Sequence, residues 1–296
     1  MNEFTIGDVQ VRRVEEMLGP AAPAKDFFRE YSEEEFKRHE NWLAPNFYEP
    51  ESGKLVTSVH SWLVRTGRHL VLIDCCSGNH KPRPGMARYD MLNTAYLDRL
   101  KAAGAAPEDI DYVMCTHLHV DHVGWNTRLV SGRWVPTFPN AKYIFSRREH
   151  DFWCDTAQRE ATQQALKNVY SDSVLPIVES GKAVLLQDTY GLDDCLTVVP
   201  APGHTPGHVR IDLKSGEQDA VFCGDVLHSP LQIVLPHWNS VFCSDPKQAA
   251  QTRRDVLSHC AETGALLMPI HFGIPYVAHI RSVPSGFEID FPHSHR

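Results

Sequence analysis

Three histidines and one aspartate lie within six residues in the segment CTHLHVDH, residues 115–122. The residues just before them, from position 111, form a short strand-like apolar segment. These side chains therefore come where a strand gives way to a loop, and a loop can turn them inward around one centre. Neutral imidazole and carboxylate are the usual ligands of zinc and similar divalent ions. The pattern predicts a metal site; the alternative is a histidine-rich surface loop.

The second half of the chain repeats the arrangement of a strand followed by a candidate ligand. A turn rich in proline and glycine, residues 200–208, presents His204, and Asp225 and His271 each end an apolar segment. Five imidazoles and two carboxylates exceed the four ligands of a closed structural zinc site and suit two ions that share one carboxylate. The candidate metal ligands are His117, His119, Asp121, His122, His204, Asp225 and His271.

Strands and helices that could position these residues alternate along the chain. Asp74 ends one of the strands, where it either orients a metal-bound histidine or simply terminates the strand. We expect strands near 4–11, 56–65, 69–75, 111–115, 141–145, 183–186, 196–199, 209–213, 220–225 and 266–271. We expect helices over 32–42, 91–103 and 246–263, and one or two more between 147 and 169.

Composition narrows the class of protein. A chain of 296 residues with 42% hydrophobic residues suits one large α/β domain. Its net charge of -8 argues against nucleic acid as a partner, and no apolar run is long enough to cross a membrane. The N-terminus lacks a signal-peptide profile, and the eight cysteines form no CxxC pair. We therefore expect a cytoplasmic protein with reduced cysteines and a small-molecule substrate; a homodimer stays open.

The motifs HLHVDH, GHTPGH, the Gly-Asp pair at 224–225 and a late strand-end histidine occur in one order. In this order they resemble the metallo-β-lactamase-fold hydrolase superfamily, over roughly residues 56–275. The resemblance implies an α/β fold, a four-layer αββα sandwich of two mixed β-sheets, in a single domain over 1–296. It also implies a ligand assignment: His117, His119 and His204 hold one ion, Asp121, His122 and His271 hold the other, and Asp225 bridges them.

The resemblance implies a dinuclear metal-dependent hydrolase of a small ester or lactone, acting through a metal-bound hydroxide. Zinc is the expected metal, with manganese, cobalt or iron as alternatives. Asp121 or Asp225 would carry the proton away. Alternative functions are phosphotriester hydrolysis, a β-lactamase or thioesterase activity, and a non-hydrolytic metal-binding protein such as a metal sensor.

His228 distinguishes this sequence within the superfamily. The quorum-quenching lactonases usually carry a tyrosine three residues after the bridging aspartate, and here that residue is His228. The chain is thus closest in pattern to the methyl parathion hydrolase and lactonase branch. An imidazole here either contacts the substrate as a catalytic group or is structural.

Three aromatic residues are candidates for the wall of the substrate pocket. Trp125 follows the metal-ligand loop, where it either lines the pocket or packs in the core. Phe47 and Tyr48 lie in a proline-bounded loop that is either a wall of the pocket or a plain connector. Residues 1–55 would form an N-terminal extension with this pocket loop. Residues 147–180 are either a helical cap inserted over the site or ordinary outer-layer helices.

Overall fold

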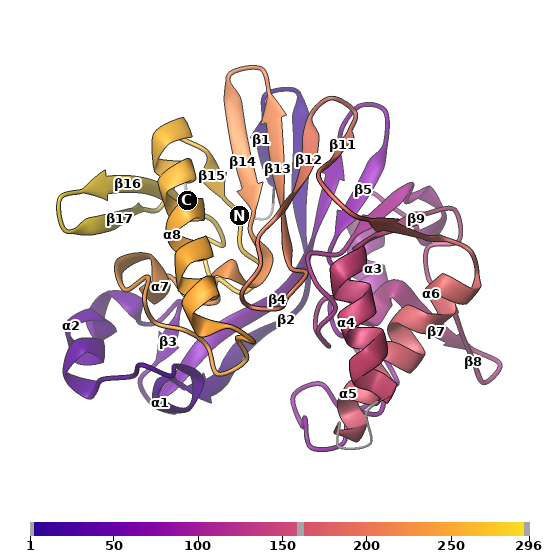
Figure 1. Ribbon diagram of the computed structural model, residues 1–296, viewed down its shortest axis with the longest axis horizontal. Coiled ribbons are helices and arrows are strands. Elements are labelled where there is room, and N and C mark those ends of the chain that lie inside the picture. Colours follow the sequence, from indigo (N-terminus) through magenta and orange to yellow (C-terminus); the bar gives the residue numbers. More distant parts are fainter. Residues whose placement is uncertain (1–2, 159–162, 293–296) are drawn as a thin grey trace. The chain divides into compact units, whose positions relative to one another are not determined.

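The computed structural model describes residues 3–158 and 163–292, in which strands and helices alternate (Figure 1). These residues fall into two compact units. Unit 1 contains residues 18–58 and 195–292, and unit 2 contains residues 3–17 and 59–194. Each unit has its own hydrophobic core, around Leu72, Val113 and Tyr143 in unit 2. The core of unit 1 includes Trp238 and Leu257.

Most strands of unit 2 lie in one mixed sheet. Strand β5 reads LVLI and is buried at every position, as expected for a strand covered on both faces. Pairing is antiparallel between β1 and β2 and between β4 and β5, and parallel from β5 through β6 and β9 to β10. In sheet order the strands are β1 (Glu3–Ile6), β2 (Val9–Pro23), β4 (Lys54–Arg65), β5 (Leu70–Ile73), β6 (Tyr112–Met114), β9 (Lys142–Ser146) and β10 (Ala183–Leu186).

The helices of unit 2 follow its sheet strands along the chain, and α4 packs on β9 and β10 (Figure 1). They are α3 (Tyr96–Ala102), α4 (Arg147–Gln158), α5 (Gln164–Val169), a π-helical turn (Tyr170–Val174) and α6 (Leu175–Glu179), with 3-10 turns at Pro107–Asp109 and Gly124–Asn126. A hairpin of β7 (Thr127–Val130) and β8 (Arg133–Pro136) and the short strand β11 (Tyr190–Leu192) complete the unit.

Unit 1 carries a second mixed sheet. Strands β12, β13 and β14 pair antiparallel, and β15 joins β14 in parallel. In unit 1 this sheet contains β12 (Leu196–Pro200), β13 (Val209–Ser215), β14 (Gln218–Phe222) and β15 (Leu266–Leu267). Strand β3 (Tyr48–Glu49) pairs with the start of β4 in the first sheet, and β16 (His279–Val283) and β17 (Gly286–Asp290) form a separate hairpin. Its helices are α1 (Ala24–Phe27), α2 (Glu33–Leu43), α7 (Leu231–Val234), α8 (Pro246–Thr263) and a 3-10 turn at Gly224–Val226.

Helix α8 shows how local sequence sets an element. Asp245 accepts a hydrogen bond from Gln248 N at 3.0 Å, Pro246 takes the first helical position, and Gly264 ends the helix at a φ of 73°. The helix packs on β14 and β16 (Figure 1). The predicted start and end of this helix are therefore confirmed.

The predicted α/β class with mixed β-sheets is confirmed, while several element bounds differ. The strand expected over 4–11 is interrupted by a turn at Gly7, with a φ of 55°, and becomes the hairpin of β1 and β2. The strand expected over 266–271 ends after Leu267, because Pro269 has no N–H to continue the ladder. Within the described residues, no helix is both long and apolar enough to cross a bilayer.

Candidate metal centre

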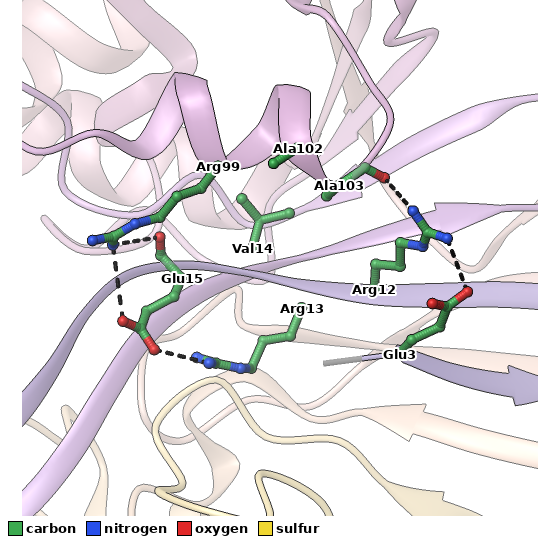
Figure 2. Close-up of a pocket in the computed structure, with 8 residues that line it drawn as sticks. All are labelled: Glu3, Arg12, Arg13, Val14, Glu15, Arg99, Ala102 and Ala103. Carbon is green, nitrogen blue, oxygen red and sulfur yellow. Dashed lines mark hydrogen bonds and ion pairs between the residues drawn. The ribbon is translucent and has the colours of Figure 1, made fainter. Parts of the chain in front are cut away.

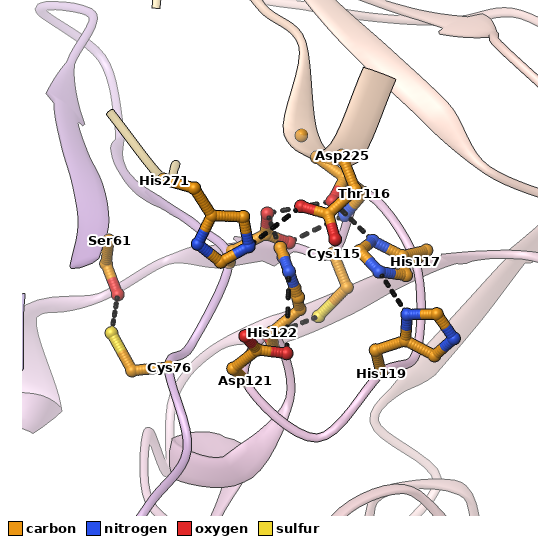
Figure 3. A network of polar contacts seen from close by, with 12 residues as sticks. Ser61, Cys76, Cys115, Thr116, His117, His119, Asp121, His122, Asp225 and His271 are labelled. Carbon is orange, nitrogen blue, oxygen red and sulfur yellow. Dashed lines mark hydrogen bonds and ion pairs between the residues drawn. The ribbon is translucent and has the colours of Figure 1, made fainter. Parts of the chain in front are cut away.

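The loop after β6 carries four of the predicted ligands in unit 2. His117 and His122 are fully buried and Asp121 is almost so. His117 Nε2 lies 3.0 Å from His119 Nδ1, a contact marked by a dashed line in Figure 3, and the planes of the two rings are 78° apart. Two imidazole nitrogens this close offer adjacent donor atoms for one cation.

Asp74 fixes the orientation of this loop. Its Oδ1 accepts from Thr116 N at 2.7 Å, and its Oδ2 accepts from Thr116 Oγ1 at 2.8 Å. The same Oδ2 lies 2.9 Å from His122 Nδ1. A histidine whose Nδ1 donates to a carboxylate presents the lone pair of Nε2, which is how metal-binding histidines are usually oriented. Asp74 itself has a φ of 56°, an uncommon backbone conformation for a residue other than glycine.

Two further side chains support the loop without any local sequence signal. Tyr89 donates its hydroxyl to Asp121 Oδ2 at 3.0 Å. Glu149, on α4, accepts from Leu118 N at 3.2 Å and from Trp153 Nε1 at 2.7 Å, and the Trp153 ring lies 5.2 Å from that of His119. Sequence reasoning missed Tyr89 and Glu149, because both reach the loop from distant parts of the chain.

In unit 1, one carboxylate lies among three imidazoles. Asp225 Oδ2 lies 3.2 Å from His204 Nε2 and 3.1 Å from His228 Nε2, and Asp225 Oδ1 lies 3.0 Å from His271 Nε2 (the last pair is drawn in Figure 3). All four residues are at least 95% buried. Three ring nitrogens directed at one buried carboxylate form a donor set that fits a divalent cation.

Backbone contacts hold these rings in place. His271 Nδ1 donates to Ser58 O at 2.8 Å, so its Nε2 is left for Asp225. His208 Nε2 accepts from Asp225 N at 3.0 Å, which fixes the backbone that carries the carboxylate. Gly203, with a φ of 131°, has no room for a side chain, since a Cβ there would lie 2.3 Å from Ala249 N.

Burial and charge shift the pKa values of His204 and His228, two of the three histidines next to Asp225, in opposite directions. Burial disfavours a charged His204, but Asp225 outweighs it and raises the pKa of His204 to about 9. At His228 burial dominates and lowers the pKa to about 4. His228 is therefore neutral at pH 7 and stacks on His271 with the ring planes 8° apart.

The three predicted pocket aromatics are buried. Trp125 is 4% exposed, stacks on Tyr96 at 5.3 Å and donates its indole N–H to Glu16 at 2.7 Å. Phe47 stacks on Phe291 at 5.3 Å, and Tyr48 meets the edge of Phe36 at 5.1 Å. A role for them in the wall of the substrate pocket stays a prediction from the sequence.

A pocket of about 580 Å³ in unit 2 contains none of the predicted ligands (Figure 2). Ion pairs lie on both sides of it, between Arg12 and Glu3 at 3.0 Å and between Arg13 and Glu15 at 2.8 Å. Its cations thus already have carboxylate partners. All seven predicted ligands, by contrast, offer donor atoms that could hold a metal ion.

Known proteins are similar to this chain in sequence and in fold. A family model described as the metallo-beta-lactamase superfamily matches residues 55–267. An N-acyl homoserine lactonase, AttM, from Agrobacterium fabrum is 33% identical over 112 residues, which are 38% of this chain and 39% of that relative. The chain thus matches about two fifths of the length of this curated relative.

Two solved structures match almost the whole chain. One is a hydrolase, AbOPH, of the beta lactamase superfamily, with a TM-score of 0.80 and 26% identity over 100% of this chain and 98% of that one. The other is AidC, a dizinc quorum-quenching lactonase in complex with a product, with a TM-score of 0.76 and 21% identity over 99% and 98%. These matches confirm the predicted metallo-β-lactamase-like fold.

Proposed function

Because the chain belongs to the metallo-beta-lactamase superfamily, we propose that it is a dinuclear zinc-dependent hydrolase of a small ester or lactone. The observation that carries the proposal is the buried Asp225 carboxylate, which has three imidazole nitrogens within 3.2 Å. A buried charge of this kind is costly unless it is paired or coordinates a metal. The lactonases among its relatives favour a lactone as the substrate.

The ligand assignment follows the order of motifs in the family. We propose that His117, His119 and His204 hold one ion. Asp121, His122 and His271 would hold the other, and Asp225 would be shared by both. Zinc suits these donors best, since imidazole and carboxylate with no thiolate match its usual open sites. When bound, two such ions supply a water of lowered pKa and an electrophile for the substrate carbonyl.

The chain's own residues orient and move protons in this proposal. Asp74 and Ser58 O fix the ring orientation of His122 and His271, so that both present Nε2. Asp121, whose Oδ2 already accepts from Tyr89, is one acceptor for the proton that the attacking water loses, and Asp225 is the other. His228, neutral at pH 7, contacts the substrate oxygen or donates a hydrogen bond from its N–H to the leaving group.

Phosphotriester hydrolysis is a second candidate function, because His228 stands where the lactonases carry a tyrosine. The same ligands would serve an attack on phosphorus. A cytoplasmic location, a homodimer and a helical cap over residues 147–180 remain predictions from the sequence; the cap includes residues 159–162, which lie outside the described residues.

Metal analysis combined with a substrate panel tests the proposal. The panel contains lactones, aryl esters, thioesters, β-lactams and phosphotriesters. We expect zinc-dependent turnover of lactones or aryl esters that a chelator abolishes and added zinc restores. Turnover confined to phosphotriesters would favour the second candidate, and no turnover of any substrate by the zinc-loaded protein would contradict a hydrolase.

A further inference from the structure

Glu16 is a buried carboxylate on β2 that sequence reasoning did not single out. It is 2% exposed, accepts three hydrogen bonds from N–H groups and accepts a longer one from Thr94 Oγ1 at 3.4 Å. Its Oε2 accepts from Ser77 N at 2.7 Å, and its Oε1 accepts from Gly78 N at 3.1 Å and from Trp125 Nε1 at 2.7 Å. Burial raises the pKa of Glu16, and these bonds oppose the rise by favouring the ionised form. A carboxylate so desolvated is retained only where several donors satisfy it.

The backbone that Glu16 holds lies directly against the backbone that follows the metal-ligand loop. A Cβ on Gly124 would fall 1.8 Å from Ser77 O, and a Cβ on Gly78 would fall 2.7 Å from the Gly124 carbonyl. The two backbones can approach this closely because residues 78 and 124 are both glycines. Gly124 N donates to Cys76 O at 2.7 Å across the same contact.

Two more backbone bonds lead from this contact to a predicted ligand. Trp125 N donates to Cys75 O at 2.7 Å, and Cys75 N donates to His122 O at 2.7 Å. Glu16 therefore binds both partners of a paired segment, Ser77 and Gly78 on one side and Trp125 on the other. The His122 backbone belongs to the same hydrogen-bonded pair.

The strand that carries Glu16 is itself anchored. Arg99 Nη1 donates to Glu15 O at 3.0 Å and to Glu16 O at 2.8 Å, and Figure 2 shows Arg99 reaching Glu15 at the edge of the pocket. The carboxylate thus extends from a fixed backbone toward the paired segments. This makes it a rigid support rather than a mobile surface charge.

We propose that Glu16 is a positioning residue for the candidate metal centre, which acts by fixing residues 75–78 against residues 122–126 and so the backbone of His122. The inference rests on the proposed function, since it assumes that His122 binds a metal. All three strong partners of Glu16 are N–H donors, so both carboxylate oxygens are required. A glutamine of the same size would turn its NH2 group toward one of these N–H groups and leave that donor without an acceptor.

The test compares Glu16→Gln with Glu15→Gln in the zinc-loaded protein. Glu15 precedes Glu16 on the same strand and its carboxylate pairs with Arg13 at 2.8 Å, so it is a matched control outside the paired segments. Titration against a chelator gives the zinc dissociation constants. The melting temperature of each variant is also measured, together with its kcat and KM for a lactone. We expect Glu16→Gln to raise the dissociation constant of one zinc by about 10–100-fold and to lower kcat with little change in KM. Glu15→Gln should leave the zinc dissociation constants, kcat and KM unchanged.

A second variant, Trp125→Phe, removes one donor and keeps the carboxylate, so it serves where Glu16→Gln does not fold. We expect it to weaken zinc binding less than Glu16→Gln does, and the double variant to show less than the sum of the two effects. Lower melting temperatures with unchanged zinc dissociation constants in these variants would reduce Glu16 to a structural residue and overturn the inference. Zinc binding by the wild type without hydrolysis would instead contradict the proposed function, while the zinc constants would still decide the role of Glu16.

Discussion

The Oδ2 atom of Asp74 lies 2.9 Å from Nδ1 of His122, and both side chains are fully buried. Asp74 also accepts both the N–H and the hydroxyl of Thr116. The Asp74 carboxylate, just after β5, thus orients the ring of His122. It also fixes Thr116, the residue before the predicted ligand His117. It is a support that a metal centre on this loop needs, because a histidine ligand must keep one tautomer.

Asp74→Asn should weaken zinc binding by about 10–100-fold, because an amide cannot accept from all three donors at once. Asp111→Asn is the matched control, since Asp111 lies just before β6 of the same sheet and also accepts from a backbone N–H, that of Leu70, at 2.8 Å. Competition with a chelator measures both variants. Equal zinc affinity in the two would show that Asp74 only shapes the loop.

His228→Ala should lower kcat on good substrates by more than about tenfold, within the range of about 10²–10⁴-fold typical of acid and base groups. His228 Nε2 lies 3.1 Å from Asp225, so metal content is measured in the same sample. Full zinc content with an unchanged kcat would make His228 structural. Loss of zinc together with activity would make it a support of Asp225.

Trp125→Ala should lower the free energy of unfolding by about 3–5 kcal/mol, because the indole is buried against Tyr96 and bonded to Glu16. Chemical denaturation measures this loss. The ratio of KM values for a bulky and a short ester tests the predicted pocket wall separately. A ratio that stays at its wild-type value would remove Trp125 from the substrate site.

Lys81 should make stability depend on pH. Burial lowers the pKa of Lys81 to about 7, although Asp172 lies 3.3 Å away and opposes the shift. A depressed folded-state pKa means that the unfolded chain binds more protons between pH 7 and 10.5. Stability from this group is therefore complete above pH 10.5 and is lost as the pH falls toward 7.

Through Lys81, the free energy of unfolding changes by at most about 1.4 kcal/mol per pH unit. Urea unfolding of the wild type and of Lys81→Met at pH 7.5 and 9 measures it. We expect the wild type to gain stability relative to the variant at the higher pH. Equal changes in both proteins would show that Lys81 keeps its proton throughout this range.

The sequence was sufficient for the parts of the fold and site that depend on local patterns. The segments that end at Cys115 and Asp225 are short and apolar, so their strands and the residues that follow could be placed without a structure. The α8 caps, Asp245 and Gly264, are equally local. Such signals depend on neighbours within a few residues.

The remaining features depend on contacts between distant residues. Glu16 lies 109 positions from Trp125, and no nearby residue indicates that the two meet. Glu149 reaches Leu118 from a helix whose pattern reads only as amphipathic. Trp125 follows a loop, and its neighbours in sequence do not indicate that its ring is buried against Tyr96.

The most direct test of the central claim is the zinc content of wild type and Asp225→Ala, measured with lactone turnover in the same samples. We expect two zinc ions per wild-type chain with turnover, because seven predicted ligands, one of them a bridging carboxylate, suit two ions. In Asp225→Ala we expect less bound zinc and no turnover, with a circular dichroism spectrum that shows a folded chain. Full zinc occupancy or undiminished turnover in Asp225→Ala would contradict a dinuclear centre bridged by this residue.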